Sequence, residues 1–362
     1  MSRARSFSKL INKDNYATYS GSDSVTDISA VSLPQGTLGF RNKIINGNFD
    51  IWQRGTSQTS AGYGSADRWN CLHSGSSKTA SQQSFTVGQT DVPGNPKYYL
   101  QHVVSSVAGT GNYCAFLQQI EGVNTLAGQT ATLSFWAKAD SNKSIATEFR
   151  QLFGTGGSPS ATVSSIGVVT HNLTTSWQKF TTTVPIPSIS GKTIGSDSND
   201  RLQINFWFDA GSNWNSRNNS LGQQSGTFDI AQVQLEEGTV PTPFEHRPIG
   251  TELSLCQRYY YLIGREQYAR YAIGYAASAT NIRWLIFFKT TMRTIPDLEQ
   301  SGNFIIQPGT LGTFDIESDT TDGTGNQCLL RSTDSSGLSA GNAVSLHSSN
   351  DINAYLAFYA EL

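Results

Sequence analysis

Residues 226–248 read GTFDIAQVQLEEGTVPTPFEHRP, and residues 42–55 read NKIINGNFDIWQRG. Apolar and polar side chains alternate in the later passage, which is the two-residue period of a half-buried strand. Its apolar side chains are Phe228, Ile230, Val233 and Leu235. The alternation slips at Ala231 and Gln232, which predicts a β-bulge, and three prolines then end the strand. We interpret the two passages as the last and first strands of one β-sandwich.

The composition of the whole chain agrees with this interpretation. Only 14% of the 362 residues are charged, so the polar surface must come mainly from Ser, Thr, Asn, Gln and Gly. Together with 11% aromatic residues and 34 glycines, this indicates an all-β protein. The net charge of −2 offers no basic surface for a phosphate backbone, so we expect no nucleic-acid partner.

The cysteines and the apolar runs exclude further classes. The four cysteines are widely spaced and show no zinc-ligand spacing, so we predict buried free thiols, with a disulfide as the alternative. The basic N-terminus lacks the apolar segment of a secretory signal. The densest apolar run, residues 284–288, is too short to span a bilayer. We therefore expect a soluble protein without membrane insertion.

Turn-rich segments separate short strand patterns between residues 41 and 250, which is typical of a sandwich or barrel. The predicted strands are 43–52, 66–73, 82–87, 97–104, 113–120, 130–139, 144–153, 162–171, 177–184, 201–209 and 227–236. Residues 1–40 are polar and sparse in apolar side chains, which predicts either an arm that orders on a partner or a disordered leader.

Residues 249–262 interrupt the strand pattern and predict a short helix with Thr251 as its N-cap. We place a domain boundary after residue 250, so that residues 251–362 form a second, smaller β-sandwich. Its predicted strands are 268–277, 282–291, 303–307, 312–317, 326–332 and 351–362. The fold prediction is therefore all-β: an irregular arm, a central jelly-roll sandwich and a C-terminal β-sandwich.

Six motifs in this order resemble a module found in bacteriophage tail-fibre and receptor-binding proteins. They are NGNFDIWQRG (46–55), ADRW (66–69), TLSFWAKA (132–139), SWQKFTTTVPIP (176–187), FDIAQVQLEEGTVPTPFEHRP (228–248) and ELSLCQRYY (252–260). That module is similar to the carbohydrate-binding jelly rolls attached to glycoside hydrolases. FFKTTMRTIPDLEQSG (287–302) and AFYAEL (357–362) also resemble the trimerising C-terminal domains of such fibres.

The resemblance implies a virion protein that is assembled in the host bacterial cytoplasm as a homotrimer. Residues 1–40 would attach it to other phage tail or capsid proteins, and the jelly roll would recognise host surface polysaccharide during adsorption. A closed trimer would bury an apolar face of the C-terminal strands. The side chains expected there are Trp284, Phe287, Tyr355 and Phe358. The alternatives are a structural tail or capsid decoration protein without sugar binding, and a glycan depolymerase.

A sugar site needs an aromatic platform for C–H faces and planar polar groups for hydroxyls. The strand at 201–209 carries such residues on its non-core face, and the strand at 144–153 and the loop at 211–220 add others. The predicted carbohydrate-binding residues are Asn205, Trp207, Asp209, Arg150, Trp214 and Arg217. The alternative is that Trp207 packs beneath a loop and Trp214 only anchors its own loop. We assign core or structural roles to Trp52, Trp69, Trp136 and Trp177, which lie in the shared motifs.

The resemblance also implies a metal. Similar jelly rolls often hold a structural calcium ion between their first and last strands, and Asp50 and Asp229 stand where its carboxylate ligands would be. The alternative is a pair of ordinary turn or ladder carboxylates, and no other cofactor is predicted.

Catalysis is not expected. The sequence GLSAG at 337–341 fits the G-x-S-x-G pattern, but its Ser/Gly-rich context predicts neither the strand nor the helix of a nucleophile elbow. Glu236 and Glu237 are consecutive in a strand, so they point to opposite faces and make a poor acid–base pair.

Overall fold

The computed structural model describes residues 40–307, 311–312, 316–333, 338–348 and 350–362. The predicted N-terminal arm, residues 1–40, lies outside the described residues apart from Phe40. Residues from Asn42 to Leu362 form one compact unit.

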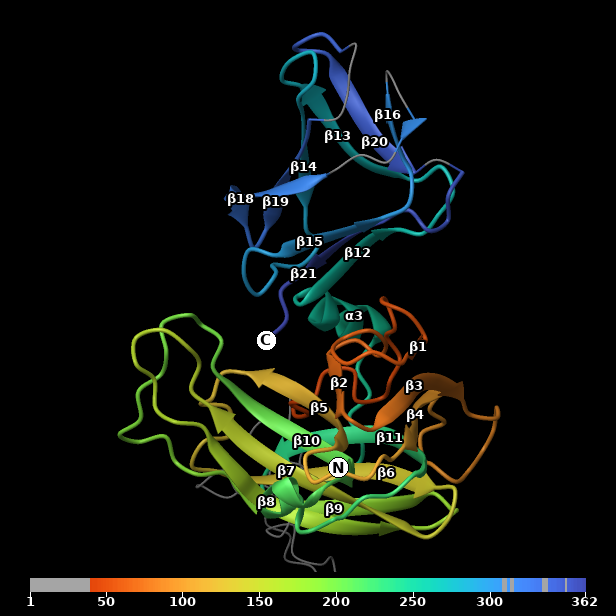
Figure 1. The fold of residues 1–362 in the computed structure, drawn as a ribbon, viewed down its shortest axis with the longest axis vertical. Helices are drawn as coiled ribbons and strands as arrows, with labels where there is room; N and C mark the ends of the chain where they lie inside the picture. The colour runs from red at the N-terminus through yellow and green to blue at the C-terminus, as the bar shows by residue number, and fades with distance from the viewer. Residues whose placement is uncertain (1–39, 308–310, 313–315, 334–337, 349) are drawn as a thin grey trace, which may run out of the picture. The chain divides into compact units, whose positions relative to one another are not determined.

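The first part of this unit is a sandwich of two antiparallel sheets (Figure 1). The six-stranded sheet has the order β1 (Ser57–Gln58), β3 (Ser77–Ser84), β4 (Tyr98–Ser105), β11 (Gly226–Glu237), β6 (Thr130–Ala139), β9 (Gln178–Pro185). The five-stranded sheet has the order β2 (Trp69–Ser74), β5 (Tyr113–Glu121), β10 (Arg201–Ala210), β7 (Lys143–Leu152), β8 (Val163–Leu173). The chain passes back and forth between the sheets, which is the winding of a jelly roll. The predicted all-β jelly roll is confirmed.

Alternation along the strands builds the core between the two sheets. Phe206 of β10 meets Phe135 of β6 edge to face at 5.2 Å, and Phe208 lies 5.1 Å from Phe228 of β11. These rings are fully buried. The neighbours of such residues on each strand point to the outer faces of the sheets, because side chains alternate along a strand. A ligand can therefore contact the side chains on the outer faces of the two sheets.

The bulge predicted in β11 is present. The pairing of β11 with β6 shifts between Ala231 and Gln234, and Gln232 has a φ of 48°. The extra residue interrupts the ladder at the middle of the strand. This irregularity shapes the outer face described below.

Residues 42–55 do not form the predicted strand. Asn46 and Phe49 both have a φ of 56°, which lies in the left-handed region and cannot continue an extended strand. The side-chain amide of Asn46 donates to the carbonyl oxygens of Ile51 and Asp67, at 2.8 and 3.0 Å, so the backbone folds around this one side chain.

The irregular passage nevertheless joins β11. The backbone N–H of Lys43 donates to the carbonyl oxygen of Leu235 at 2.8 Å, and the N–H of Val233 donates to that of Gly47 at 2.8 Å. A Cβ on Gly47 would lie 2.1 Å from the Val233 oxygen, so only glycine permits this approach. The two passages quoted at the outset are therefore neighbours in space, although only one of them is a strand.

The chain leaves the sandwich through α3 (Ile249–Gln257) (Figure 1). The predicted helix is present, but it begins two residues before the predicted cap. Pro248 is the N-cap, and Thr251 lies inside the first turn. The boundary predicted after residue 250 falls within this helix.

Two antiparallel sheets follow. The three-stranded sheet has the order β12 (Tyr260–Gly264), β21 (Tyr355–Tyr359), β15 (Asp297–Ser301). The seven-stranded sheet has the order β17 (Leu311–Gly312), β16 (Phe304–Gln307), β20 (Ala343–Ser348), β13 (Arg270–Ala276), β14 (Ile282–Phe287), β19 (Gln327–Ser332), β18 (Glu317–Thr324). Strands β12, β15 and β20 were not predicted, and β18 overlaps the predicted strand 312–317 only at Glu317. Side chains from both sheets, such as Trp284 and Phe358, share the second hydrophobic core.

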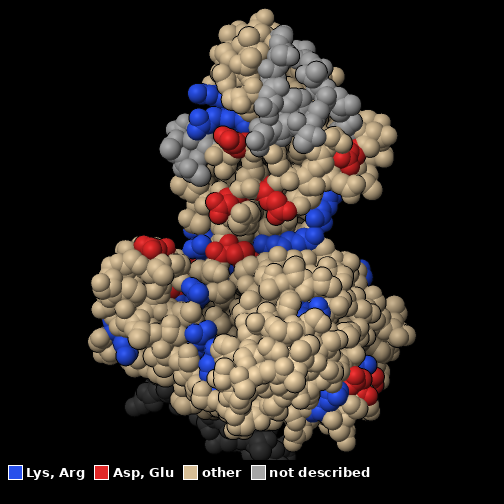
Figure 2. Space-filling view, in the orientation of Figure 1, with Lys and Arg blue, Asp and Glu red and all other residues tan. Residues whose placement is uncertain are grey.

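The structure also bears on the predictions about the cysteines, membrane spans and surface charge. All four cysteines are buried thiols, and no disulfide links them. No helix among the described residues is both long and apolar enough to cross a membrane. Most of the surface visible in Figure 2 is neither acidic nor basic, as the low content of charged residues predicts.

Candidate functional site

The outer face of the five-stranded sheet gathers four of the predicted sugar-binding residues around one buried carboxylate, that of Glu148 on β7. This side chain is 0% exposed. It accepts hydrogen bonds from Asn205 Nδ2 at 2.8 Å and Trp207 Nε1 at 3.2 Å. The guanidinium of Arg217, from the short helix α2 (Asn215–Asn218), donates to both carboxylate oxygens at 2.9 Å. Sequence reasoning did not include Glu148 among the site residues.

The two tryptophans of this face contact neighbouring groups and differ in exposure, because Trp207 is buried and Trp214 is half-buried. The Arg217 guanidinium lies 5.0 Å from the Trp207 ring and 5.5 Å from the Trp214 ring. Trp207 is only 2% exposed, so it offers no ring face to a sugar in this conformation. The indole N–H of Trp214 donates to the carbonyl of Gly111 at 3.0 Å and fixes its loop. The contacts of Trp207 fit the alternative in which it packs beneath a loop. Trp214 anchors its own loop, and its role in sugar binding stays a prediction.

Arg150 and Asp209, the other two predicted residues, have separate partners. Arg150 Nε donates to Ser164 Oγ at 3.0 Å, and burial, with the positive charge of Arg217 second, lowers the pKa of Arg150. The pairing of β10 with β5 shifts between Trp207 and Asp209. Asp209 is fully buried and joins loops instead of the Glu148 cluster. It accepts from Ser76 Oγ at 2.6 Å, Ser106 Oγ at 2.7 Å and the Gln224 N–H at 2.8 Å.

The two carboxylates predicted to share calcium do not fit that role. Asp229 accepts from Gln101 Nε2 at 3.0 Å and lies 3.5 Å from the ammonium of Lys138, so a cation already occupies its side. Asp50 instead accepts from Asn48 Nδ2 at 2.8 Å. Burial raises the pKa of both carboxyl groups, and these hydrogen bonds offset part of that rise. Within the described ranges, no three His, Cys, Asp or Glu side chains lie close enough together to hold a metal.

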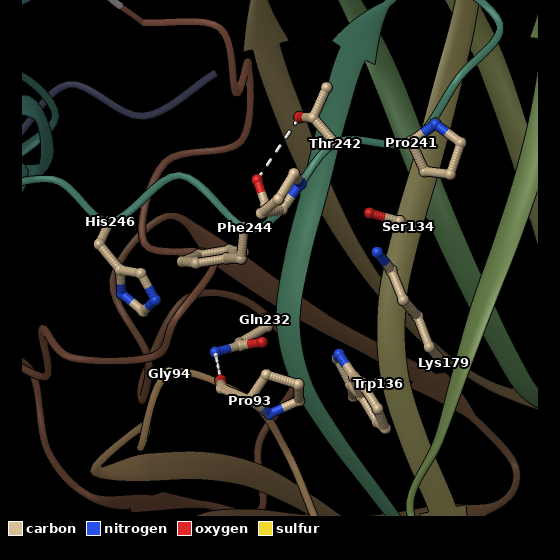
Figure 3. Close-up of a pocket in the computed structure, with 11 residues that line it drawn as sticks. Pro93, Gly94, Ser134, Trp136, Lys179, Gln232, Pro241, Thr242, Phe244 and His246 are labelled. Atoms are coloured by element: carbon tan, nitrogen blue, oxygen red, sulfur yellow. Dashed lines mark hydrogen bonds between the residues drawn. The ribbon is translucent and has the colours of Figure 1, made fainter. Parts of the chain in front are cut away.

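A cavity of about 550 Å³ opens on the outer face of the six-stranded sheet (Figure 3). Its floor comes from β6, β9 and β11, and its walls come from the turn at 93–94 and the segment 241–246. Figure 3 shows Trp136 and Lys179 on one side, with Phe244 and His246 on the other. Volume, an aromatic floor and a few polar groups are the usual attributes of a small-ligand site.

The bulge in β11 forms the base of this cavity. Gln232, at the bulge, donates from its amide nitrogen to the carbonyl oxygen of Pro93 at 2.7 Å. In Figure 3 its oxygen points away from Pro93. Gly94 follows with a φ of 80°, and a Cβ there would lie 2.6 Å from His246 Nε2. Glycine is therefore required for the turn to approach the histidine ring.

A buried carboxylate fixes the opposite wall. Glu236 Oε1 accepts from the Thr242 N–H at 2.8 Å, and its Oε2 accepts from the Thr242 hydroxyl at 2.6 Å. The N–H of Glu245 donates to Gln234 Oε1 at 2.8 Å. These bonds hold the proline-rich segment against β11, so Phe244 keeps its place beside the cavity.

The lining of the cavity combines apolar rings with positive charge. Trp136 is half-buried and stands directly across the ladder from the exposed Lys179. The rings of Phe244 and His246 meet edge to face at 5.1 Å. No carboxylate belongs to the residues that line the cavity, and within the described part of the chain Lys179 makes no ion pair. The cavity therefore suits a ligand with apolar faces, hydroxyl groups and neutral or negative charge.

Sequence reasoning missed this cavity because it assigned Trp136 a structural role. One signal was present: Ser134, Trp136 and Lys138 alternate along TLSFWAKA on the face away from the core. That a cavity forms over them depends on the 93–94 turn and the 241–246 segment, which come from distant parts of the chain.

No protein-family model and no curated protein sequence matches this chain. Several solved structures are similar to about half of this chain. A family 11 carbohydrate-binding module from Clostridium thermocellum, in complex with a β-1,3-1,4-mixed-linked tetrasaccharide, is 12% identical with a TM-score of 0.29, over 52% of this chain and 98% of that one. The CBM22-2 xylan-binding domain of Paenibacillus barcinonensis Xyn10C is 14% identical with a TM-score of 0.30, over 54% and 97%.

A phage protein is similar over a shorter share of its own length. The enzymatically active domain of tailspike protein 4 of bacteriophage CBA120 is 15% identical with a TM-score of 0.31. The similarity covers 55% of this chain and 22% of that one. Because these identities and scores are low, we infer function below from the residues of this chain.

Proposed function

We propose that this chain is a glycan-binding protein whose jelly roll takes a polysaccharide into the cavity of Figure 3. The observation that carries the proposal is the half-buried ring of Trp136 beside the polar groups of Gln232, Ser134 and Lys179. Sugars present apolar C–H faces that stack on such a ring, and hydroxyls that bond to amide, hydroxyl and ammonium groups. The cavity volume lies within the range that is usual for small-ligand sites.

The biological setting of the proposal rests on the six phage-fibre motifs. The chain is proposed to be a non-enzymatic receptor-binding protein of a bacteriophage fibre, located on the virion and directed at host surface polysaccharide. Residues 1–40 are proposed to attach it to tail or capsid proteins. Glycoside hydrolysis commonly uses two carboxyl groups, and none lines the cavity, which supports a binding role. Several copies on one particle would strengthen weak binding at each site.

An exposed apolar stripe supports the proposed homotrimer. On β13 and β14 the side chains that face away from the core include Ile273, 73% exposed, and Phe287, 67% exposed, with Tyr275 and Leu285 beside them. Contiguous exposed apolar side chains on a sheet mark an interaction surface. Trp284 and Phe358, which were predicted to face the trimer, are instead fully buried within the single chain.

Replacing Phe287 by serine is expected to weaken the trimer. Light scattering after gel filtration should give the wild-type chain the molar mass of three copies. The variant trimer should dissociate at protein concentrations about tenfold higher than the wild-type trimer does. The reason is that the variant no longer removes a large apolar side chain from water on assembly. Val87→Ser is the matched control, because Val87 is fully exposed outside the stripe. A monomeric wild-type chain would refute the trimer.

Replacing Trp136 by alanine is expected to lower polysaccharide affinity by about 30-fold or more, since truncating a central aromatic anchor typically costs at least 2 kcal/mol. Wild-type and variant chains are compared on an array of bacterial surface polysaccharides, with thermal unfolding to confirm that both are folded.

Trp214→Ala is the matched control, because Trp214 lies in the 211–220 loop beside the five-stranded sheet. Loss of binding in Trp214→Ala, with Trp136→Ala unaffected, would move the site to the face around Glu148. No binding of the wild-type trimer to any polysaccharide would favour a structural decoration protein. Release of reducing ends from a bound polysaccharide would favour a depolymerase.

A further inference from the structure

A second tryptophan–lysine pair lies beside the cavity on the same outer face. Trp136 on β6 stands opposite Lys179 on β9. Two positions along β6, the ammonium of Lys138 lies 5.3 Å from the ring centroid of Trp177, which directly precedes β9. Residues two apart in a strand share a face, so the two pairs form a four-residue checkerboard in which each strand contributes one tryptophan and one lysine.

The second tryptophan is part of a small aromatic cluster. Trp177 lies 5.2 Å from Phe85 and 5.3 Å from Tyr99, and these two rings are 4.8 Å apart. All three are half-buried, and none belongs to a hydrophobic core of the sandwich. A rigid ring that is partly open to solvent is a stacking platform of the same kind as Trp136.

The spacing separates the two platforms into two subsites. Trp136 and Trp177 are diagonal neighbours on adjacent strands, which places their backbone positions about 7–8 Å apart. One sugar ring cannot lie flat on both, but two sugar units of one chain can. A ligand that uses both platforms is therefore a polymer crossing β6, and not a single terminal sugar.

The charges of these four residues indicate the sign of the charge that the polymer carries. Lys138 is already paired, because its ammonium lies 3.5 Å from Asp229 Oδ2. Lys179 stands exposed beside the cavity and, within the described residues, has no acidic partner. An anionic group on the ligand would satisfy Lys179 at the point where the two subsites meet.

We infer that the ligand is a linear acidic polysaccharide bound across β6, with one sugar on Trp136, a neighbouring sugar on Trp177, and a carboxylate at Lys179. This inference rests on the proposed glycan-binding function, and it adds the length and the charge of the ligand. The site lies on the six-stranded sheet, opposite the face that the sequence indicated.

The test uses the full chain and a panel of acidic and neutral bacterial polysaccharides. The best-bound polymer is cut into fragments of increasing length, and part of it is chemically reduced so that its carboxyl groups become alcohols. Trp177→Ala is expected to lower affinity for fragments of two or more sugars about tenfold and to leave single sugars unchanged, because a single sugar fills only the Trp136 subsite. Trp177→Tyr keeps a ring and should restore most of the affinity.

Lys179→Gln is the charge probe. It is expected to lower affinity for the acidic polymer about tenfold and to have no effect on the reduced polymer, and the wild-type affinity should fall as salt is raised. A bound polymer without acidic groups, unchanged binding after reduction, or equal loss in Trp177→Ala at every fragment length would overturn the inference while leaving glycan binding intact. Absence of polysaccharide binding by the wild-type chain would refute the proposed function itself.

Discussion

Replacing Glu148 by alanine is expected to lower the free energy of unfolding by about 3–5 kcal/mol, one of the largest effects of a single substitution in this chain. The carboxylate is fully buried and holds the guanidinium of Arg217, which is itself only 20% exposed. Its removal leaves that charge, and the N–H groups of Asn205 and Trp207, without their acceptor. Urea denaturation at pH 7 measures the loss, and an unchanged m-value confirms that only stability has changed.

The matched control for Glu148→Ala is Glu237→Ala. Glu237 is exposed at the end of β11, so its removal should change stability by less than about 0.5 kcal/mol. The double variant Glu148→Ala/Arg217→Ala should lose less than the sum of its two single variants, because the orphaned charge is then absent. A loss below about 1 kcal/mol for Glu148→Ala would show that Glu148 does not fasten α2 over Trp207. It would also reopen this face as a ligand site.

The strands of the sandwich could be predicted because apolar and polar residues alternate along them with the two-residue period of a strand. In β10, Leu202, Ile204 and Phe206 alternate with polar residues, and the observed strand differs from the predicted one by a single residue. The bulge at Gln232 could also be predicted, since one extra residue breaks the alternation of apolar and polar residues. These features are local properties of the sequence.

The predictions from the sequence fail where contacts with distant parts of the chain determine the local structure. Residues 43–52 were predicted to form a strand, but the Asn46 side chain supplies hydrogen bonds that compete with a ladder, and no periodicity reveals this. Strand β15 reads DLEQS and has too few apolar residues to signal a strand. It forms because β21 offers it a partner with which to pair.

The candidate site also has features that the sequence could predict and features that it could not. Alternation correctly placed Asn205 and Trp207 on the outer face of β10, but it could not show that α2 covers them. Trp136 also lies on the outer side of its strand by alternation, but it was assigned a core or structural role because it belongs to a shared motif, and such a motif does not show exposure. Which outer face is open depends on the docking of α2, of the 93–94 turn and of the 241–246 segment. That docking is set by tertiary packing and not by spacing along the chain.

Acidification from pH 7 to pH 4.5 is expected to expose two opposing contributions to stability, from His171 and Asp67. His171 is 5% exposed, Thr147 shares a 2.9 Å hydrogen bond with its ring, and burial lowers its pKa from 6.5 to about 4. Its neutral form is favoured in the folded state, so its contribution is fully present above pH 6.5 and is lost as the pH falls toward 4. The loss at pH 4.5 is about 2.5 kcal/mol.

Asp67 acts in the opposite direction over nearly the same range. It is fully buried, and burial raises its pKa from 3.8 to about 6 even though Arg54 and Gln53 favour the charged form. The folded chain therefore takes up this proton before the unfolded chain does. Stability from Asp67 is fully present below pH 3.8 and is lost as the pH rises through 6, so acidification to pH 4.5 restores about 2 kcal/mol.

Two variants separate these contributions, because each removes one titrating group while keeping a polar side chain. The quantity compared is the change in unfolding free energy between pH 7 and pH 4.5, measured by urea denaturation. His171→Asn should lose about 2.5 kcal/mol less than wild type on acidification, and Asp67→Asn should lose about 2 kcal/mol more. His102, whose pKa burial also holds well below 6.5, adds to the acid loss in all three proteins. If the three proteins change equally, neither group titrates differently between the folded and unfolded chains. If the variants differ from wild type with the same sign, one of the two pKa directions is wrong.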